Sequence, residues 1–251
     1  MTDEIAPTAA VLLIGDELLS GRTQDSNLAY IARFLATYGI DVCEARVVSD
    51  REEEIVAALN ALRAGYTYVF TTGGIGPTHD DITTDAVGRA FGVRVDYHAD
   101  ALALLAPRYR PGEFNEMRRR MARIPEGAAL IRNSVSVAPG YQIGNVFVLA
   151  GVPMIMRAML EDIGPRLITG RVVLSQTISA EVGEGRIAVA LAQIQRDHRD
   201  VAIGSYPAFT ETGPRVQLVV RGRDGEAVER ATAAIEAALR ADAISSTRIA
   251  S

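Results

Sequence analysis

Hydrophobic residues in the amino-terminal part of the chain alternate between short continuous runs and stripes at helical spacing. Ala10–Ile14 is apolar throughout, which is typical of a strand covered on both faces. Val42–Val48 and Tyr66–Phe70 are further short runs, rich in β-branched and aromatic residues, that we expect to be strands. The segments between the runs carry apolar residues at helical spacing, namely Leu28, Ile31 and Leu35 in the first and Ile55, Leu59 and Leu62 in the second. The pattern therefore predicts a β-α-β-α-β unit.

The short connections between these elements are typical of an α/β fold, in which helices cover a parallel sheet. Right-handed crossovers and the flavodoxin-like strand order 2-1-3 would make the first and third strands neighbours. Ligands of such sheets bind beyond the carboxyl ends of the strands, where the order reverses. Asp16 follows the first predicted strand, and Asp80 and Asp81 follow the third. We therefore expect these acidic residues to meet at the mouth of one crevice.

The rest of the chain predicts more helices and a second, smaller domain. The expected helices are Asp100–Tyr109, Phe114–Arg123, Pro153–Ile163, Gly185–Gln195 and Ala227–Ala241, and the expected strands are Ala129–Ile131, Val135–Ala138, Val146–Leu149, Val172–Ile178, Val201–Tyr206 and Val216–Val220. A run containing glycine and proline, 164–171, marks a domain boundary. We predict an α/β domain over residues 1–168 and a small α+β domain over residues 169–251. The element order of the smaller domain suggests a split, ferredoxin-like fold with one strand short or missing.

Composition narrows the classes of function. The net charge of −5 disfavours broad nucleic-acid binding, which requires a basic face. The single cysteine, Cys43, permits no internal disulfide. The apolar run Ala9–Ile14 is too short for a membrane segment, so we expect a cytoplasmic protein without a membrane partner. The sequence contains no lysine, which excludes P-loop and Schiff-base chemistry and leaves carboxylates, hydroxyls, arginine or a bound metal.

A glycine-rich loop joins the third predicted strand to a helix that begins near Ala86. From Thr71 to Asp85 it reads Thr-Thr-Gly-Gly-Ile-Gly-Pro-Thr-His-Asp-Asp-Ile-Thr-Thr-Asp. Glycines allow close approach of a ligand, and a helix N-terminus attracts anions, so we expect the loop to hold a phosphate group of a nucleotide or pterin. The alternative is structural, because glycines also serve tight strand–helix turns and Asp81 stands where a helix N-cap belongs.

Several arginines follow in the predicted helix Phe114–Arg123. They are Arg118, Arg119, Arg120 and Arg123. Side chains at these spacings point around the helix, so at most one or two of them would face the cleft as a phosphate clamp.

Long motifs in the chain resemble the amino-terminal part of competence/damage-inducible protein A. The first loop reads Gly-Asp-Glu-Leu-Leu-Ser-Gly-Arg-Thr-Gln-Asp-Ser-Asn from Gly15 to Asn27, and it combines with the loop Thr71–Asp85. The likeness continues through Phe114–Ala128, Asn133, Ala138-Pro139-Gly140, Gly151-Val152-Pro153 and Ile203–Pro207. It thus spans nearly the whole chain and identifies a member of the molybdopterin-binding superfamily. The deamidase domain that often follows in the family has no counterpart in this sequence, so we expect a stand-alone protein.

The resemblance carries expectations about fold and activity. It implies a three-layer α/β/α domain with a mostly parallel sheet, followed by a small α+β domain. Relatives in the competence-protein branch hydrolyse ADP-ribose and related dinucleotide pyrophosphates with a divalent metal, here magnesium, cobalt or manganese. Relatives in the molybdopterin branch adenylate the pterin phosphate, and the eukaryotic FAD synthase carries a domain of this type. Relatives are dimers or trimers, so we expect a homo-oligomer.

The same resemblance assigns roles to individual residues. Asp81 and Asp16 are the expected catalytic residues, and with Asp80 they are the expected metal ligands. The expected ligand-binding residues are Gly73, Gly74, Gly76, Thr72, Asp25, Asn27, Asn133, Pro139 and Gly140. The expected ligand is a small phosphorylated nucleotide or pterin.

The chain departs from the family pattern at several places. Asp80 stands where the cofactor-synthesis enzymes have an arginine, which disfavours adenylyl transfer and favours hydrolysis of a dinucleotide pyrophosphate. Ser136-Val137 replaces an expected Gly-Thr, and Ile155 replaces an expected glutamate. Molybdopterin adenylyl transfer and a non-catalytic ligand-binding module remain as alternatives.

Overall fold

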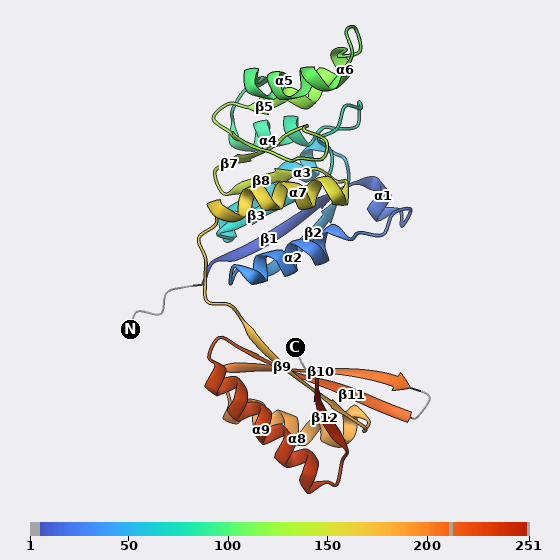
Figure 1. Ribbon diagram of the computed structural model, residues 1–251, viewed down its shortest axis with the longest axis vertical. Coiled ribbons are helices and arrows are strands. Elements are labelled where there is room, and N and C mark those ends of the chain that lie inside the picture. Colours follow the sequence, from blue (N-terminus) through green and yellow to red (C-terminus); the bar gives the residue numbers. More distant parts are fainter. Residues whose placement is uncertain (1–5, 211–212, 250–251) are drawn as a thin grey trace. The chain divides into compact units, whose positions relative to one another are not determined.

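A six-stranded sheet forms the middle layer of the larger of two units (Figure 1). The computed structural model describes residues 6–210 and 213–249, and the chain divides into Met1–Gly170 and Arg171–Ser251. The strands, in sheet order, are β2 (Asp41–Val48), β1 (Thr8–Ile14), β3 (Tyr68–Thr72), β8 (Val146–Leu149), β7 (Gly140–Ile143) and β6 (Ala129–Ile131). The four strands from β2 to β8 are parallel, whereas β7 and β6 run antiparallel to their neighbours. The predicted mostly parallel sheet and its 2-1-3 order are confirmed.

Helices cover both faces of this sheet because its central strands bury alternate residues on opposite sides. On β1, Leu12 and Ile14 pack with α3 (Glu52–Gly65) and α4 (Thr83–Phe91). Val11 and Leu13 pack on the other face with α2 (Asn27–Thr37) and α7 (Pro153–Ile163). All four of these β1 side chains are at most 2% exposed. The predicted three-layer α/β/α architecture is therefore confirmed.

One predicted strand of the larger unit is wrong. Residues 134–136 form a turn, and β7 begins only at Gly140. The Asn133 Oδ1 atom accepts the backbone N–H groups of Val135 and Ser136, at 3.2 and 2.8 Å, which closes the turn. Val137 has a φ of 58°, a left-handed value that a strand excludes.

The arginine-rich segment is also less helical than its sequence predicts. The expected helix Phe114–Arg123 consists of α6 (Glu116–Arg119), a 3₁₀ turn at Arg120–Ala122 and the strand β5 (Arg123–Pro125). β5 pairs antiparallel with β4 (Val95–Tyr97), a strand that the sequence pattern did not indicate. The preceding helix α5 (Ala99–Leu105) ends in a 3₁₀ turn at Ala106–Arg108, which contains Pro107. A short helix α1 (Asp16–Leu19) also follows β1, where we expected only a break.

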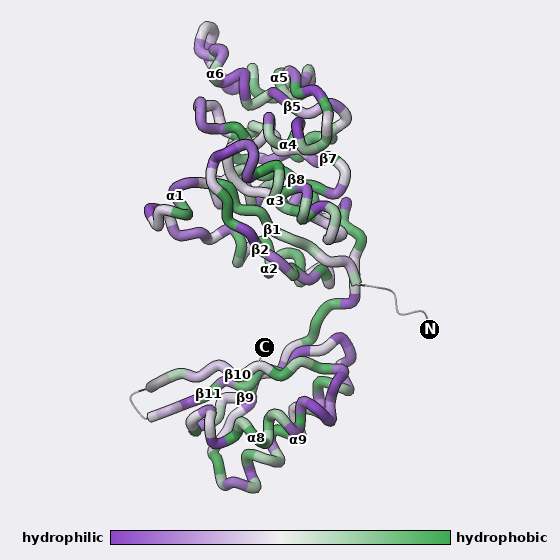
Figure 2. The backbone as a smooth tube through the Cα atoms, turned by 180° about the vertical axis from the view of Figure 1, so that it is seen from behind, coloured by the Kyte–Doolittle hydropathy of each residue, from purple (hydrophilic) through white to green (hydrophobic). Residues whose placement is uncertain are grey.

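The smaller unit is a four-stranded antiparallel sheet with two helices. Its elements are β9 (Leu174–Ala180), α8 (Glu184–Asp197), β10 (Val201–Thr210), β11 (Gly213–Gly222), α9 (Gly225–Ala241) and β12 (Ser246–Ile249). The sheet order β10-β11-β9-β12 completes a split, ferredoxin-like fold, because β12 supplies the strand that the sequence left short or missing. Hydrophobic and hydrophilic residues alternate along α9 (Figure 2), as expected of a helix that buries one face. Within the ranges that the structure describes, no helix is long and apolar enough to cross a membrane.

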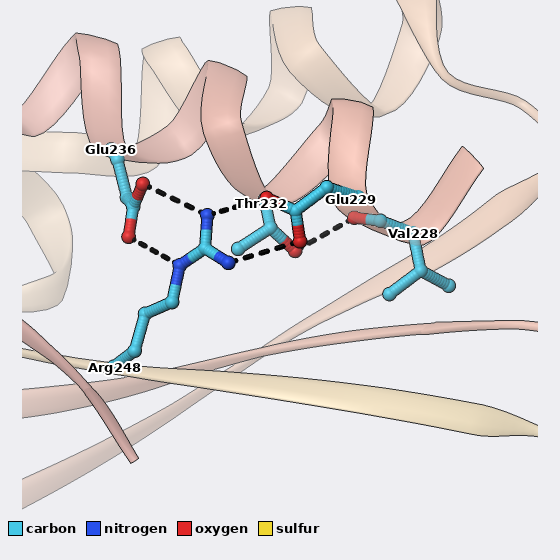
Figure 3. A network of polar contacts seen from close by, with 5 residues as sticks. All are labelled: Val228, Glu229, Thr232, Glu236 and Arg248. Atoms are coloured by element: carbon cyan, nitrogen blue, oxygen red, sulfur yellow. Dashed lines mark hydrogen bonds and ion pairs between the residues drawn. The ribbon is translucent and has the colours of Figure 1, made fainter. Parts of the chain in front are cut away.

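A single arginine ties β12 to the helix layer of the smaller unit. The Arg248 guanidinium donates to the carboxylates of Glu229 and Glu236 on α9 at distances from 2.6 to 3.1 Å (Figure 3). These bonds are the main reason that the pKa values of both glutamates lie below the usual value. Two bidentate contacts fix the guanidinium plane, so they orient a strand that has few buried apolar residues of its own.

The Arg248 contacts predict a pH-dependent contribution to stability. Arg248→Met is expected to lower the melting temperature at pH 7 by a few degrees, because the two carboxylates lose their cation. The folded pKa values of Glu229 and Glu236 are lowered, so the contribution is present above their unfolded pKa of about 4.3 and disappears as the pH falls through the folded values. Thermal unfolding from pH 7 to pH 3 measures this, with Arg230→Met as the control. A difference from wild type that stays constant down to pH 3 would contradict the assignment.

Candidate functional site

A cleft of about 450 Å³ lies at the carboxyl ends of the central parallel strands. Its floor comes from the glycine loop after β3, and its sides come from the residues after β1, β2 and β8. The lining residues are Ile14, Glu17, Asp50, Gly73, Gly74, Ile75, Gly76, Pro77, Asp80, Asp81, Met121, Ser136, Ala138, Pro139, Ala150, Gly151, Val152, Ile155 and Met159. This is the edge at which ligands of open parallel sheets bind.

The cleft is acidic. Glu17, Asp50, Asp80 and Asp81 line it, whereas the described residues contribute no arginine or histidine to its wall. The pKa of Asp50 is raised, first by burial and then by the negative charges of neighbours that include Glu17 and Asp80. Four carboxylates in one cleft therefore favour a bound cation.

The structure places Asp16 differently from our expectation. Its side chain is exposed and does not line the cleft, but its backbone N–H donates to Asp50 Oδ2 at 2.9 Å. Glu17 and Asp50 occupy the acidic side of the cleft instead. The sequence analysis did not include Asp50 among the expected site residues. The predicted strand order could have indicated Asp50, because the 2-1-3 order places the end of β2 at the same edge of the sheet as the ends of β1 and β3.

Asp81 closes the glycine loop rather than capping α4. Its Oδ2 atom accepts the Thr78 backbone N–H at 2.8 Å and the Thr78 hydroxyl at 2.5 Å. The N-cap of α4 is Ile82, and no side chain caps this end of the helix. The half-buried Asp81 carboxylate is therefore held by the loop while it lines the cleft.

The loop glycines have a structural reason as well as a place in the cleft. A Cβ atom on Gly73 would lie 2.2 Å from the Ile14 carbonyl oxygen, and one on Gly74 would lie 2.2 Å from Thr83 Oγ1. Both glycines also have positive φ, at 107° and 67°. A Cβ atom on Gly76 would lie 2.7 Å from Asp81 Oδ2. Glycine at these positions lets the loop press against β1, α4 and Asp81.

The same loop offers backbone donors to a ligand. Thr83 holds the loop against α4, because its hydroxyl donates to the Gly73 carbonyl at 2.9 Å and its N–H to the Gly74 carbonyl at 3.0 Å. The N–H groups of Gly74, Ile75 and Gly76 donate to no acceptor in the part of the chain that the structure describes. Successive free peptide N–H groups in a glycine turn form a concave binding site for anions.

A second, smaller hollow of about 80 Å³ shares Ile14, Glu17, Gly73 and Gly151 with the cleft. It contains three residues expected to bind ligand: Thr72, Asp25 and Asn27. Asp25 caps α2, accepting the backbone N–H groups of Asn27 and Leu28 at 3.3 and 2.9 Å.

Asn27 lines this hollow and has a buried acceptor without a partner among the described residues. It is 5% exposed, and its Nδ2 donates to the Gly151 carbonyl at 2.8 Å. That bond fixes the amide, and its buried Oδ1 atom has no partner in the described part of the protein. Buried acceptors are rarely left unpaired, so the hollow is suited to a ligand group that donates an N–H or O–H.

The remaining expected ligand residues support the far wall. Pro139 lines the cleft directly. Asn133 does not line it, but besides closing the turn it donates from Nδ2 to the Ala138 carbonyl at 2.7 Å. Gly140 is also outside the lining, and its lack of a side chain serves packing, because a Cβ atom would lie 2.3 Å from the Val148 carbonyl oxygen.

The structure contains no preformed metal-binding site among the described residues. No group of three or more histidine, cysteine, aspartate or glutamate side chains there has the geometry to hold a metal ion. A magnesium ion that binds a phosphorylated ligand needs only one or two protein carboxylates, because phosphate oxygens and waters complete its octahedron. The cleft carboxylates fit a magnesium ion that is shared with a phosphorylated ligand.

The close approach of Gly74 to Thr83 predicts a local destabilisation. Gly74→Ala is expected to reduce the free energy of unfolding by about 1–3 kcal/mol, because alanine is strained at this φ and its Cβ meets Thr83 Oγ1. Gly65→Ala is the matched control, since no heavy atom lies within 4 Å of a Cβ at that position. Denaturant unfolding of both variants measures the difference. Equal stability of the two would show that the loop adapts without cost.

Family comparisons agree with this architecture. Residues 10–169 match the family described as "Probable molybdopterin binding domain", and residues 172–248 match the family described as "FAD synthase, middle domain". A protein of Pyrobaculum calidifontis is 33% identical over 246 residues, covering 93% of this chain and 94% of that protein. A protein of Archaeoglobus fulgidus is 31% identical over 226 residues, covering 90% and 95% of the two chains.

A solved structure supports the same assignment for the larger unit. The crystal structure of CinA from Thermoplasma acidophilum, a protein of unknown function, is 34% identical and superposes with a TM-score of 0.61. The match covers 64% of this chain and 98% of the CinA chain. The chain therefore belongs to the molybdopterin-binding-domain family as a CinA-like member, and in this chain a domain that matches the FAD synthase middle domain follows.

Proposed function

We propose that the cleft binds a phosphorylated nucleotide and hydrolyses a dinucleotide pyrophosphate, such as ADP-ribose, with the help of a divalent metal. The observation that carries the proposal is the combination of three free loop N–H groups with four carboxylates in a cleft of about 450 Å³. The N–H groups favour an anion, whereas the carboxylates repel one. Metal and phosphate together satisfy both requirements.

The metal would be held from the acidic side of the cleft. Asp50 and Asp80 are the leading candidates, because both line the cleft and the negative charge of Asp80 adds to the burial that raises the pKa of Asp50. Glu17 and Asp81 line the same space, whereas Asp16 acts through the N–H that it donates to Asp50. A divalent metal in this position would neutralise phosphate charge and lower the pKa of a bound water.

The protein itself would bind and orient the substrate. The N–H groups of Gly74, Ile75 and Gly76 would hold one phosphate, and the Asn27 Oδ1 atom would accept a hydroxyl or N–H group of the nucleoside. Hydrolysis adds the oxygen of water to one phosphorus atom and breaks its bond to the bridging oxygen, which leaves with the other phosphate. Fixing the phosphate on backbone groups restricts the direction from which water can attack.

A molybdopterin ligand is the second candidate. The family description of residues 10–169 favours it, and a pterin also offers N–H donors for the Asn27 acceptor. Asp80 stands where the resemblance places an arginine in the adenylating enzymes, which disfavours transfer of an adenylyl group. Complementation of a strain deficient in the molybdenum cofactor would separate this function from pyrophosphate hydrolysis.

The proposal predicts that Asp50→Asn lowers ADP-ribose hydrolysis by roughly 100-fold, the usual effect of removing one group that stabilises developing charge. The assay compares magnesium, cobalt and manganese and measures release of the two monophosphates. Asp81→Asn is expected to have a similar effect, whereas Asp96→Asn, on exposed β4, leaves turnover unchanged. The hydrolase proposal would be contradicted if the wild type showed no turnover with any of the three metals. It would also be contradicted if Asp50→Asn turned over ADP-ribose as fast as the wild type.

The Asn27 acceptor predicts a specific dependence on ligand donors. Removing the ribose hydroxyl hydrogens of ADP-ribose by methylation should weaken binding to the wild type about tenfold, because a buried acceptor then loses its partner. Asn27→Ala should bind the two ligands equally, since it has no acceptor to leave unpaired. Calorimetry measures the Kd of both ligands for the wild type and for Asn27→Ala. An equal methylation effect in the two proteins would place the donor contact elsewhere.

A further inference from the structure

The acidic lining of the cleft leaves one phosphate of a pyrophosphate without an obvious cation. A metal held by Asp50 and Asp80 would lie beside the residues that follow β2 and β3. The cleft lining also contains Met121, which belongs to the arginine-rich segment α6–β5. The arginines of that segment are therefore candidates for a positive charge beside the cleft.

Most of these arginines are already engaged with other partners. Arg123 makes a bidentate contact with Asp85, at 2.9 and 2.6 Å. Arg118 donates to the Glu113 carbonyl and lies over the Tyr109 ring, with its Cζ atom 4.6 Å from the ring centroid. Arg119 lies over the Phe114 ring at 5.6 Å.

Arg120 differs in both partner and position. Its Nη2 atom lies 3.5 Å from the backbone carbonyl oxygen of Asp81, which belongs to the glycine loop. It shares a small hollow with Gly76 and Asp81, and both of these residues also line the main cleft. No carboxylate within the described ranges 6–210 and 213–249 forms an ion pair with it.

The backbone that carries Arg120 is anchored on its carboxyl side. The following strand β5 pairs with β4, and the Ala122 carbonyl accepts the His98 N–H at 2.9 Å. Ala122 is fully buried, and Met121 lines the cleft. A half-buried guanidinium on such a segment can turn toward a ligand without moving the chain, and its remaining N–H groups are free to form a bidentate contact with a phosphate.

We propose that Arg120 is the cationic contact for the second phosphate of a pyrophosphate ligand, and so selects diphosphates over monophosphates. The proposal rests on the function proposed above, because it assumes that one phosphate occupies the loop N–H groups. The loop and the metal would hold that phosphate, and Arg120 would reach the other past Gly76. The ligand class that fits is a nucleoside diphosphate or a larger nucleotide with an internal pyrophosphate.

Calorimetry with the full chain, magnesium and two probes tests the proposal. The probes are inorganic pyrophosphate and adenosine monophosphate. Arg120→Ala is expected to raise the Kd for pyrophosphate about tenfold or more, since a charge-assisted contact is lost, and to change the Kd for the monophosphate little. Arg120→Lys should recover part of the pyrophosphate affinity. Arg119→Ala is the matched control, and melting temperatures check that all variants fold.

The outcomes separate this inference from the hydrolase proposal. Equal weakening of both probes by Arg120→Ala, or an effect no larger than that of Arg119→Ala, overturns the role of Arg120 alone. Selective loss of pyrophosphate binding supports it, even if the wild type hydrolyses no ADP-ribose. Wild-type protein that binds neither probe overturns the role of Arg120 together with the proposed phosphate site.

Discussion

The site depends on how closely the glycine loop approaches the end of β1. Gly73 follows β3 directly, and a Cβ atom at this position would lie 2.2 Å from the Ile14 carbonyl oxygen. The approach is possible because β1 and β3 are adjacent, parallel and apolar, so burial on both faces fixes their register. Without it, the loop N–H groups and the carboxylates after β1 and β2 would not share one cleft. The position of the polar groups thus follows from apolar packing beneath them.

Charge is the second constraint on the cleft. Asp50 is partly buried near other carboxylates, and its pKa is raised first by burial and then by the negative charges of Asp16, Glu17 and Asp80. The Asp16 N–H offsets part of this shift by donating to Asp50. A phosphate alone would add to the repulsion, whereas a metal–phosphate pair would reduce it. The cleft is therefore better matched to a metal-bound ligand than to either component separately.

The sequence predicted those parts of the structure whose signal lies within single elements. β1 and β3 consist mainly of apolar residues, so their burial and the 2-1-3 order could be inferred from pattern alone. The error at Val135–Ala138 arose because the Asn133 side chain, rather than a neighbouring strand, satisfies the backbone there. β4 and β5 have only three residues each and depend on pairing across a gap in sequence, which periodicity does not register. The exposed position of Asp16 and the unpaired Asn27 acceptor could not be predicted, because they depend on tertiary contacts that the sequence pattern does not register.

The structural and functional explanations of the glycine loop are not alternatives. Gly74 is required for contact with Thr83, and that contact uses the Gly74 carbonyl and leaves its N–H free. Thr78 likewise fixes the Asp81 carboxylate, which remains part of the cleft wall. Each internal contact therefore orients a group that still has bonding capacity on the ligand side. A loop built only to connect β3 with α4 would have no need to present three successive donors beside four carboxylates. Their arrangement is best explained by a ligand that carries both an anion and its cation.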